Sequence, residues 1–500
     1  MSEAMRPFGG AQACLIDGVW SDGDSELEID VIDPATEEVI ANFPEATIEQ
    51  ARSAVDSARR AFESGPWSAF TPGDRSRVLH QLADRLEARA DEFADLVVAE
   101  IGSPVRLAQG LHVGASIECL RFFADAAARG PRGGWEEALP LHEVPIMSAS
   151  VLRREAAGVV AAITAYNYPL LLLARKVGGA LAAGCTEVVV PSPRAPLTTV
   201  ALLRELEHTD LPPGVLNLVV GGIDVARELT TNPHVDVVSF TGSLEVGREV
   251  MAQAATGVKK VVLELGGKSP NIVLPGTDFA EAVGPSSLRF MLNTGQGCGA
   301  TTRTFVPAAE YGDWVEASRD FFRTVKVGDP RDPATDVGPL VGSAHRDRVQ
   351  GYVDRALENG AVIEANTPSP TDRGFFIDPM LVGSVGNADE ISQEELFGPV
   401  GVVIPFEDVE QALELAHQTR FGLNANIWGP VPEAIRLARR LRSGTVTING
   451  GGGMRQDVPW GGMGASGVGR EAGEEGFNEY LEVKHIQWPL GETTKPFGAE

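Results

Sequence analysis

The sequence between residues 159 and 264 decides the fold, and it opens with VVAAITA at residues 159–165. Short segments rich in Val, Ile and Leu follow, and stretches with helical periodicity separate them. The segments predict strands at Val159–Ala165, Glu187–Val190, Leu216–Val220, Val235–Phe240 and Lys260–Glu264. The stretches between them predict helices at Leu170–Ala183, Thr198–Glu207, Val225–Leu229 and Leu244–Ala255. This alternation predicts an α/β fold with a doubly wound parallel sheet, an architecture that often binds nucleotides.

The regions on either side of this stretch predict further helices and a second α/β unit. Residues 47–64 have apolar side chains at helical spacing, and Thr47 with Gln50 forms a capping-box pattern. A second helix is expected from about Asp74. Beyond Gly266 the pattern predicts another α/β region that extends to about Gly464. Its predicted elements include helices at Phe279–Leu292 and Ala344–Glu358 and a strand at Thr445–Asn449.

The composition narrows the partners that the chain can have. Of 500 residues, 43% are hydrophobic and 22% are charged, which is ordinary for a globular protein. The net charge of -27 argues against nucleic acid, because phosphate binding needs clustered Lys and Arg. Small molecules are therefore the expected partners. The four cysteines are scattered without metal-binding spacing and fit a reducing cytoplasm: Cys14, Cys119, Cys185 and Cys298.

One uncharged stretch, residues 156–174, approaches the length of a membrane span. Gly158, Asn167 and Pro169 interrupt it, so a buried strand, a turn and the start of a helix are predicted instead. The first fourteen residues contain no continuous apolar run of the kind found in signal peptides. No membrane partner is expected.

Polar residues follow three of the predicted strands at their carboxyl ends, where open α/β sheets bind ligands. Asn167 follows the first strand, Thr241-Gly242-Ser243 follows the fourth, and Glu264 ends the fifth. The segment from Gly242 to Gly247 opens a helix, whose free N–H groups could meet a pyrophosphate. It lacks the GxGxxG fingerprint, and a plain tight turn explains it equally well.

Cys298 lies in the segment Asn293-Thr294-Gly295-Gln296-Gly297-Cys298. Its glycine neighbours leave the thiol uncovered, whereas a structural cysteine more often has apolar neighbours. Both the nucleophile and the structural interpretation stay open at this point. Cys185, in an apolar stretch, is expected to serve packing.

Three motifs together resemble the aldehyde dehydrogenase superfamily of the NAD(P)-dependent, hydrolytic, non-phosphorylating type. They are Glu264-Leu265-Gly266-Gly267-Lys268-Ser269-Pro270 with Gly295-Gln296-Gly297-Cys298, Pro459-Trp460-Gly461-Gly462, and Ser466-Gly467-Val468-Gly469-Arg470-Glu471. The resemblance covers nearly the whole chain, from Ile16 to Lys484.

The resemblance implies a role for each catalytic candidate. Cys298 would attack the aldehyde carbon as a thiolate, and the resulting thioester would be hydrolysed by water that Glu264 activates. The side-chain amide of Asn167 and the backbone N–H of Cys298 would stabilise the oxyanion, by ~3–4 kcal/mol per donor. Lys176 would lie near the proton path and the nicotinamide ribose. No metal is implied.

The cofactor contacts that the resemblance implies come from several loops. Glu395 would hold the nicotinamide ribose, and Phe397 would pack beside the ring. The full set is Thr164, Ala165, Tyr166, Ser192, Gly242, Ser243, Gly247, Leu265, Gly266, Glu395 and Phe397.

The chain departs from the family pattern after the second strand. The family's Lys-Pro-Ser-Glu stretch, whose Lys and Glu bind the adenosine ribose, is here Val190-Pro191-Ser192-Pro193. Arg194 could pair with a 2′-phosphate or be a solvated loop residue. NAD is therefore the first expectation, and NADP stays possible.

The substrate is undecided from the sequence. Arg175 resembles an arginine at the substrate entrance of semialdehyde and lactaldehyde dehydrogenases, which would attract a carboxylate. An apolar or aromatic aldehyde fits the other candidate walls equally well. The candidate substrate contacts are Tyr166, Tyr168, Leu172, Arg175, Leu292 and Trp460.

The family resemblance also implies a division into three parts. Residues 1–133 and 155–264 would form the dinucleotide-binding domain, and 265–465 the catalytic domain with the nucleophile. Residues 134–154 and 466–500 would form a small β oligomerisation or bridging element, with a hairpin near His142–Arg153 and a last strand around Glu479–Gln487. Such an exposed edge needs covering, so a homodimer or homotetramer is expected.

Two alternative functions remain at this stage. A CoA-acylating relative would release the thioester to CoA, and Glu264 argues against it because water activation would be unwanted. A catalytically silent binding or structural protein could share the scaffold. The presence of Cys298, Glu264 and Asn167 argues against that alternative.

Overall fold

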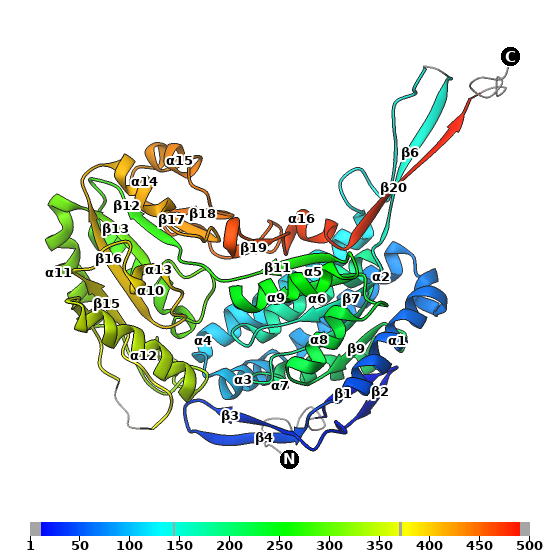
Figure 1. Ribbon diagram of the computed structural model, residues 1–500, viewed down its shortest axis with the longest axis horizontal. Coiled ribbons are helices and arrows are strands. Elements are labelled where there is room, and N and C mark those ends of the chain that lie inside the picture. The colour runs from blue at the N-terminus through cyan, green and yellow to red at the C-terminus, as the bar shows by residue number, and fades with distance from the viewer. Residues whose placement is uncertain (1–11, 144–145, 370–372, 491–500) are drawn as a thin grey trace.

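The computed structural model describes residues 12–143, 146–369 and 373–490. Two large sheets with helices around them lie next to each other, and a long β arm projects from one side (Figure 1). The uncharged stretch 156–174 forms a buried strand, a turn and the start of a helix, as predicted. No helix of the described residues is long and apolar enough to cross a membrane.

The first sheet contains all five predicted strands, side by side and parallel. Three short antiparallel strands that the pattern did not predict extend its two edges. The order across the sheet is β19 (Gly467–Val468), β11 (Lys260–Glu264), β10 (Val237–Thr241), β7 (Val159–Ile163), β8 (Thr186–Val190), β9 (Leu216–Val219), β1 (Cys14–Ile16) and β2 (Val19–Ser21). Since β19 belongs to this sheet, the segment 466–500 contributes to more than the β arm.

Helices cover both faces of the first sheet, as its doubly wound topology requires. The crossover helices are α6 (Pro169–Ala183), α7 (Leu197–Arg204), α8 (Ile223–Thr231) and α9 (Leu244–Ala255). The N-terminal helices are α1 (Ile48–Ser64), α2 (Pro72–Ala88), α3 (Ala90–Ile101), α4 (Val105–Leu107) and α5 (Ala115–Arg129), with a π-helical turn at Ala108–Gly114. The predicted capping box of Thr47 and Gln50 is confirmed at the start of α1. A hairpin of β3 (Glu28–Asp33) and β4 (Glu38–Pro44) precedes them.

The second sheet is parallel except for its edge strand β14. Its order is β14 (Val362–Asn366), β15 (Met380–Gly383), β16 (Val400–Phe406), β13 (Arg303–Pro307), β12 (Pro270–Val273), β17 (Asn424–Trp428) and β18 (Thr445–Ile448). Its helices are α10 (Phe279–Met291), α11 (Tyr311–Phe322), α12 (Ser343–Glu358), α13 (Glu390–Gln393), α14 (Val409–His417) and α15 (Val431–Ala438). The two helices and the strand predicted here are confirmed to within one residue at each end.

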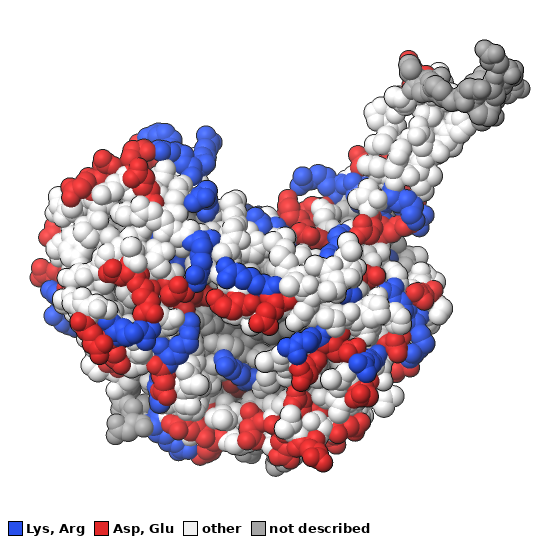
Figure 2. All heavy atoms as spheres, in the orientation of Figure 1, with Lys and Arg blue, Asp and Glu red and all other residues white. Residues whose placement is uncertain are grey.

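The projecting arm is a three-stranded antiparallel sheet in the order β20 (Leu481–Pro489), β6 (Ser148–Ala156) and β5 (Glu136–Ala138). Helix α16 (Gly473–Asn478) leads into β20. All residues of β20 after Leu481 are exposed, including Val483, Ile486 and Trp488. In Figure 2 much of the visible surface of the arm is free of charged side chains. Exposed apolar strands of this kind are typical of surfaces that another chain covers.

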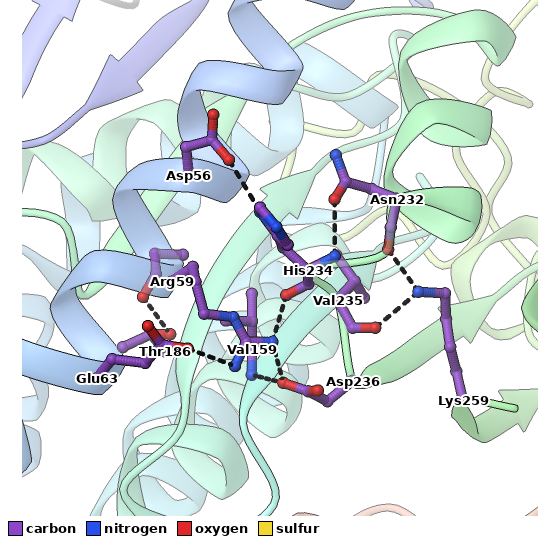
Figure 3. Close-up of polar contacts among 11 residues, drawn as sticks. Asp56, Arg59, Glu63, Val159, Thr186, Asn232, His234, Val235, Asp236 and Lys259 are labelled. Carbon is purple, nitrogen blue, oxygen red and sulfur yellow. Dashed lines mark hydrogen bonds and ion pairs between the residues drawn. The ribbon is translucent and has the colours of Figure 1, made fainter. Parts of the chain in front are cut away.

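A polar cluster at the amino end of the first sheet joins the sheet to α1 (Figure 3). The carboxylate of Asp236 accepts hydrogen bonds from the backbone N–H of Val159, at 2.7 Å, and from the Arg59 guanidinium, at 2.6 Å. The second contact is also an ion pair. The Nδ1 atom of His234 lies 3.0 Å from the Oδ1 atom of Asp56 on α1. Asp236 thus fixes the start of the central strand β7.

Gly158, the residue before β7, has no side chain, and the carboxylate of Asp236 occupies the space that a side chain would need. Its φ is +135°, and a Cβ there would lie 1.9 Å from Oδ2 of Asp236. We predict that Gly158→Ala lowers the free energy of unfolding by about 2 kcal/mol or more, because strain and a clash combine. Denaturant unfolding followed by tryptophan fluorescence measures the change. Gly312→Ala is the control, since no atom of the described part of the chain lies within 4 Å of a Cβ at Gly312 in α11. Equal stability of both variants would contradict the prediction.

Candidate active site

A cleft of about 810 Å³ lies at the carboxyl edge of the first sheet, where the second sheet region faces it. Asn167, Glu264 and Cys298, the three catalytic candidates, all line it. So do ten predicted cofactor contacts: Thr164, Ala165, Tyr166, Ser192, Gly242, Ser243, Leu265, Gly266, Glu395 and Phe397. Figure 2 shows acidic and basic side chains interspersed on the surrounding face. The loops that follow the parallel strands therefore converge on one site, as the topology predicts.

Gly247 is the predicted cofactor contact that does not line the cleft. It lies one turn inside α9, where a Cβ would be 2.5 Å from the Leu265 side chain. Its small size lets α9 pack against the segment after β11. The helix start itself is at Leu244, and the Ser243 hydroxyl accepts a hydrogen bond from the N–H of Val246 at 3.4 Å.

The loop before Cys298 has an unusual backbone. Asn293, Thr294 and Gly295 have φ values of 52°, 57° and 72°, so three consecutive residues lie in the left-handed region. Non-glycine residues adopt this conformation rarely, and surrounding contacts must hold it. At Gly295 a Cβ would lie 2.1 Å from the carbonyl of Gly398, so only glycine fits.

Two hydrogen bonds tie this loop to the segment after β7. The side-chain amide of Asn167 donates to the carbonyl of Gln296 at 2.9 Å. The side-chain amide of Asn293 donates to the carbonyl of Asn167 at 2.8 Å. Because an amide nitrogen carries two hydrogens, Asn167 keeps one for an oxyanion beside Cys298. The reciprocal bonds fix the nucleophile loop relative to the donor.

The half-buried Cys298 thiol lies among groups that disfavour its thiolate form. Burial raises its pKa to about 12, and the carboxylates of Glu395 and Glu264 add to the increase. Arg175 acts in the opposite direction. A thiolate here requires an adjacent base or a further positive charge in the cleft.

Glu264 is a buried carboxyl group at the end of β11. Neither of its oxygens has a hydrogen-bond partner among the residues that the structure describes, and 4% of the residue is exposed. Burial raises its pKa well above the usual value, and the charge of Glu471 adds to this. Gly461 makes room for it, because a Cβ there would lie 2.5 Å from a Glu264 oxygen. An unsatisfied carboxyl group in a cleft is typical of a general base.

Lys176 lies outside the cleft lining and is fully buried on α6. Its ammonium group forms a 2.6 Å ion pair with Glu471 and a 3.0 Å hydrogen bond to Ser239. The Tyr480 hydroxyl donates to the same Ser239 oxygen at 3.2 Å. Glu471 ends the motif Ser466-Gly467-Val468-Gly469-Arg470-Glu471, but the sequence alone predicts no role for it. Only its position next to Lys176 reveals one.

The opposite wall of the cleft comes from the second sheet region. Glu395 accepts a hydrogen bond from the N–H of Gly267 at 3.0 Å, and burial raises its pKa to about 7. Phe397 packs edge-on against Tyr166 and His345, each with 6.1 Å between ring centroids. His345 and Arg348 also line the cleft, and the sequence did not predict them.

The atypical Pro191–Pro193 stretch also lines the cleft, so the family's missing Lys and Glu would have faced it. Arg194 is exposed, and its guanidinium lies 5.6 Å from the centre of the Tyr166 ring. The Ser192 hydroxyl accepts a hydrogen bond from the N–H of Arg194 at 3.3 Å. At this end of the cleft Arg194 therefore provides a positive charge. The carboxylate that the family has at the position of Pro193 is missing.

Of the predicted substrate contacts, Tyr166 lines the cleft and the other five do not. Tyr168 and Trp460 lie against the glycines that flank Cys298: a Cβ on Gly297 would be 3.4 Å from the Tyr168 hydroxyl, and one on Gly299 would be 2.7 Å from the Trp460 ring. The remaining three differ in exposure, with Leu172 and Arg175 buried and Leu292 42% exposed.

A family model described as "Aldehyde dehydrogenase family" matches residues 20–486. The chain belongs to the aldehyde dehydrogenase family. It is 36% identical over 482 residues to the betaine aldehyde dehydrogenase of Bacillus subtilis, with 95% of this chain and 97% of the relative covered.

Solved structures of the family match the fold over almost its full length. The betaine aldehyde dehydrogenase of Staphylococcus aureus in complex with NAD⁺ is 33% identical, with a TM-score of 0.94 and coverage of 100% of this chain and 98% of that one. A mutant form of aldehyde dehydrogenase C from Pseudomonas syringae, in complex with NAD⁺ and octanal, is 35% identical, with a TM-score of 0.90 and coverage of 96% and 97%. The mixed α/β fold of the family is thus confirmed for this chain.

Proposed function

We propose that this chain oxidises an aldehyde to a carboxylic acid with NAD⁺ and water. The convergence of Cys298, Asn167 and Glu264 on one cleft carries the proposal. Cys298 sulfur forms a bond to the aldehyde carbon, and Asn167 donates a hydrogen bond to the resulting oxyanion. Loss of a hydride leaves a thioester on Cys298. Glu264 takes a proton from a water molecule that attacks the thioester, and the acid leaves as the thiol is restored.

The residues of the cleft fit NAD⁺. The hydroxyls of Thr164 and Thr241 are buried in its wall and have no partner among the described residues, and the turn of Gly242 and Ser243 that precedes α9 also lines it. Glu395 would hold the nicotinamide ribose and Phe397 would pack beside the ring. When bound there, NAD⁺ supplies a hydride acceptor and a positive charge that favours the Cys298 thiolate. The NAD⁺ complexes of similar structures support the same choice.

NADP⁺ is the second candidate cofactor. Val190 and Pro193 provide no carboxylate to repel a 2′-phosphate, and Arg194 could pair with one. NAD⁺ remains the first candidate, because the Arg194 side chain is exposed. Apart from its position over the Tyr166 ring, it makes no contact among the described residues that would hold it in place for a phosphate.

Two alternative functions have less support. Transfer of the acyl group to CoA needs a site where water is not activated, and the unpartnered Glu264 argues for hydrolysis. A silent binding protein would have no need of a left-handed loop that holds Cys298 beside Asn167. Both alternatives predict that no acid forms from aldehyde and NAD⁺ alone.

The test is the formation of reduced cofactor, followed by absorbance, with a panel of aldehydes. We expect NADH and carboxylic acid in equal amounts without added CoA, and a lower kcat/KM with NADP⁺. A requirement for CoA would select the acylating alternative. Absence of turnover with every aldehyde and both cofactors would overturn the proposed function.

Further proposals concern assembly and location. We propose that residues 1–133 and 155–264 bind the cofactor, that 265–465 supply the nucleophile, and that the segments 134–154 and 466–500, whose described residues include most of the β arm, join subunits in a homodimer or homotetramer. The exposed apolar residues of β20 support the last point. All four cysteines are free thiols, which supports a reducing compartment such as the cytoplasm.

A further inference from the structure

The residues around Cys298 form a tight turn. The carbonyl of Gly297 accepts a hydrogen bond from the backbone N–H three residues later, at 3.0 Å, so Cys298 and Gly299 are the two central residues of a β-turn. Just before the turn, the side-chain amide of Asn167 donates to the carbonyl of Gln296 at 2.9 Å. The entry to the turn is therefore fixed by a residue that follows β7 of the first sheet.

A second asparagine holds the exit of this turn. Asn424, the first residue of β17 in the second sheet, donates a side-chain hydrogen bond to the carbonyl of Gly299 at 2.8 Å. Strand β17 pairs with β12 on one side and with β18 on the other, so the donor lies on a rigid element. Each of the two sheets thus supplies one asparagine amide, and the two amides bind the backbone on either side of Cys298.

The hydrogen bonds of Asn424 are one-sided. Its Nδ2 donates to Gly299, while its buried Oδ1 has no partner among the described residues. Asn426, which lies on the same face of β17, is satisfied at both atoms: Nδ2 donates to Asn271 and Oδ1 accepts from the Thr447 hydroxyl, each at 2.8 Å. A buried amide with an unpaired acceptor lowers stability, so its presence needs a reason. The hydrogen bond to Gly299 is the interaction that this side chain provides.

We propose that Asn424 is a positioning residue for the nucleophile, and that its hydrogen bond to the Gly299 carbonyl fixes the turn so that the sulfur and the backbone N–H of Cys298 face the aldehyde carbonyl together. This inference rests on the proposed function and names a further residue that the reaction requires. The sulfur bonds to carbon in the same step in which the N–H meets the oxyanion, so a shift of the turn misplaces both groups. A misplacement of ~1 Å can cost ~10²-fold in rate.

The first test replaces Asn424 by leucine, which fills similar space but cannot donate to Gly299. Enzyme in excess is mixed rapidly with NAD⁺ and an aldehyde that the wild-type enzyme oxidises, and absorbance gives the rate constant of the first turnover. In Asn424→Leu this rate constant is expected to fall at least about 30-fold, because the exit of the turn is no longer held. The dissociation constant of NAD⁺, measured by calorimetry, should stay at the wild-type value, since Asn424 does not line the cofactor cleft.

The matched control is Asn426→Leu, the same substitution on the same face of the same strand. Asn426 has hydrogen-bond partners at both ends of its amide, so this variant should lose at least as much stability as Asn424→Leu. Its partners Asn271 and Thr447 do not belong to the Cys298 loop, and the first-turnover rate should therefore equal that of wild type. A purely structural role for Asn424 predicts instead that the two variants have equal first-turnover rates.

Asn424→Asp is a second test that keeps the shape of the side chain, and it decides the matter if the leucine variant does not fold. The new carboxyl group can donate to the Gly299 carbonyl only when it is protonated. The ratio of first-turnover rates, variant to wild type, is therefore expected to be lowest at high pH.

The outcomes separate this inference from the proposed function. An unchanged first-turnover rate in Asn424→Leu, an equal loss in Asn426→Leu, or a ratio near unity for Asn424→Asp at high pH would overturn the role of Asn424 alone. Absence of NADH formation by the wild-type enzyme with every aldehyde would instead overturn the oxidation itself.

Discussion

Replacing Cys298 by alanine is expected to abolish aldehyde oxidation and to lower the rate of NADH formation at least about 10⁴-fold. The sulfur is the atom that bonds to the aldehyde carbon, and neither Asn167 nor Glu264 can take its place as a covalent carrier of the acyl group. The measurement is the steady-state rate of NADH formation at saturating aldehyde, with the limit of detection set by a sample without enzyme.

The matched control is Cys14→Ala. Cys14 is also buried, but it lies on β1 at the far edge of the first sheet from β11 and Glu264. This variant should retain the wild-type turnover rate. NAD⁺ binding should persist in Cys298→Ala, because most of the cleft wall comes from other residues. Turnover that survives in Cys298→Ala would exclude the thiol as nucleophile.

Replacing Glu264 by glutamine is expected to uncouple the two halves of the reaction. Thioester formation needs no general base at this position, so each active site should form one NADH in a rapid first turnover. Hydrolysis should then slow by about 10²–10³-fold, because the amide cannot accept a proton from water. Rapid-mixing absorbance measures the burst and the steady rate in one experiment, so the variant serves as its own control for folding and cofactor binding.

The pH dependence provides a second check on Glu264. Its pKa is raised by burial, so the carboxylate that accepts the proton is lost as pH falls through this raised value. Wild-type hydrolysis should therefore increase with pH across that range, well above the ordinary pKa of a glutamic acid. In Glu264→Gln this increase should disappear. A variant with unchanged steady-state turnover, or without a burst, would contradict the assigned role.

The sequence predicted the parallel strands and the location of two catalytic candidates for a shared physical reason. Strand periodicity locates the carboxyl ends, and polar residues at those ends meet in space because parallel strands share an edge. Asn167 and Glu264 follow directly from this rule. Cys298 does not lie on the first sheet, so its place beside them needed the family resemblance. The edge strands β1, β2 and β19 have only two or three residues each, too few for a periodic pattern.

Contacts between residues far apart in the chain could not be predicted. Glu471 is 295 residues from Lys176, and Gly461 makes room for Glu264 only through tertiary packing. Gly247 illustrates the opposite problem: the family resemblance implies a cofactor contact for it, yet one turn of helix places it against Leu265 instead of the cleft. Local spacing does not specify which face of a helix meets a ligand.

The ion pair between Lys176 and Glu471 also constrains how the chain matures during synthesis. Lys176 belongs to the first sheet's crossover helix α6, but its carboxylate partner Glu471 follows 295 residues later in the chain. A ribosome-bound chain therefore exposes the lysine, or buries it unpaired at a cost, until Glu471 has been synthesised. We expect the first sheet to stay loosely packed around α6 until Glu471 has left the ribosome. Chains that end prematurely would then keep an open core, which marks them for chaperones and proteases.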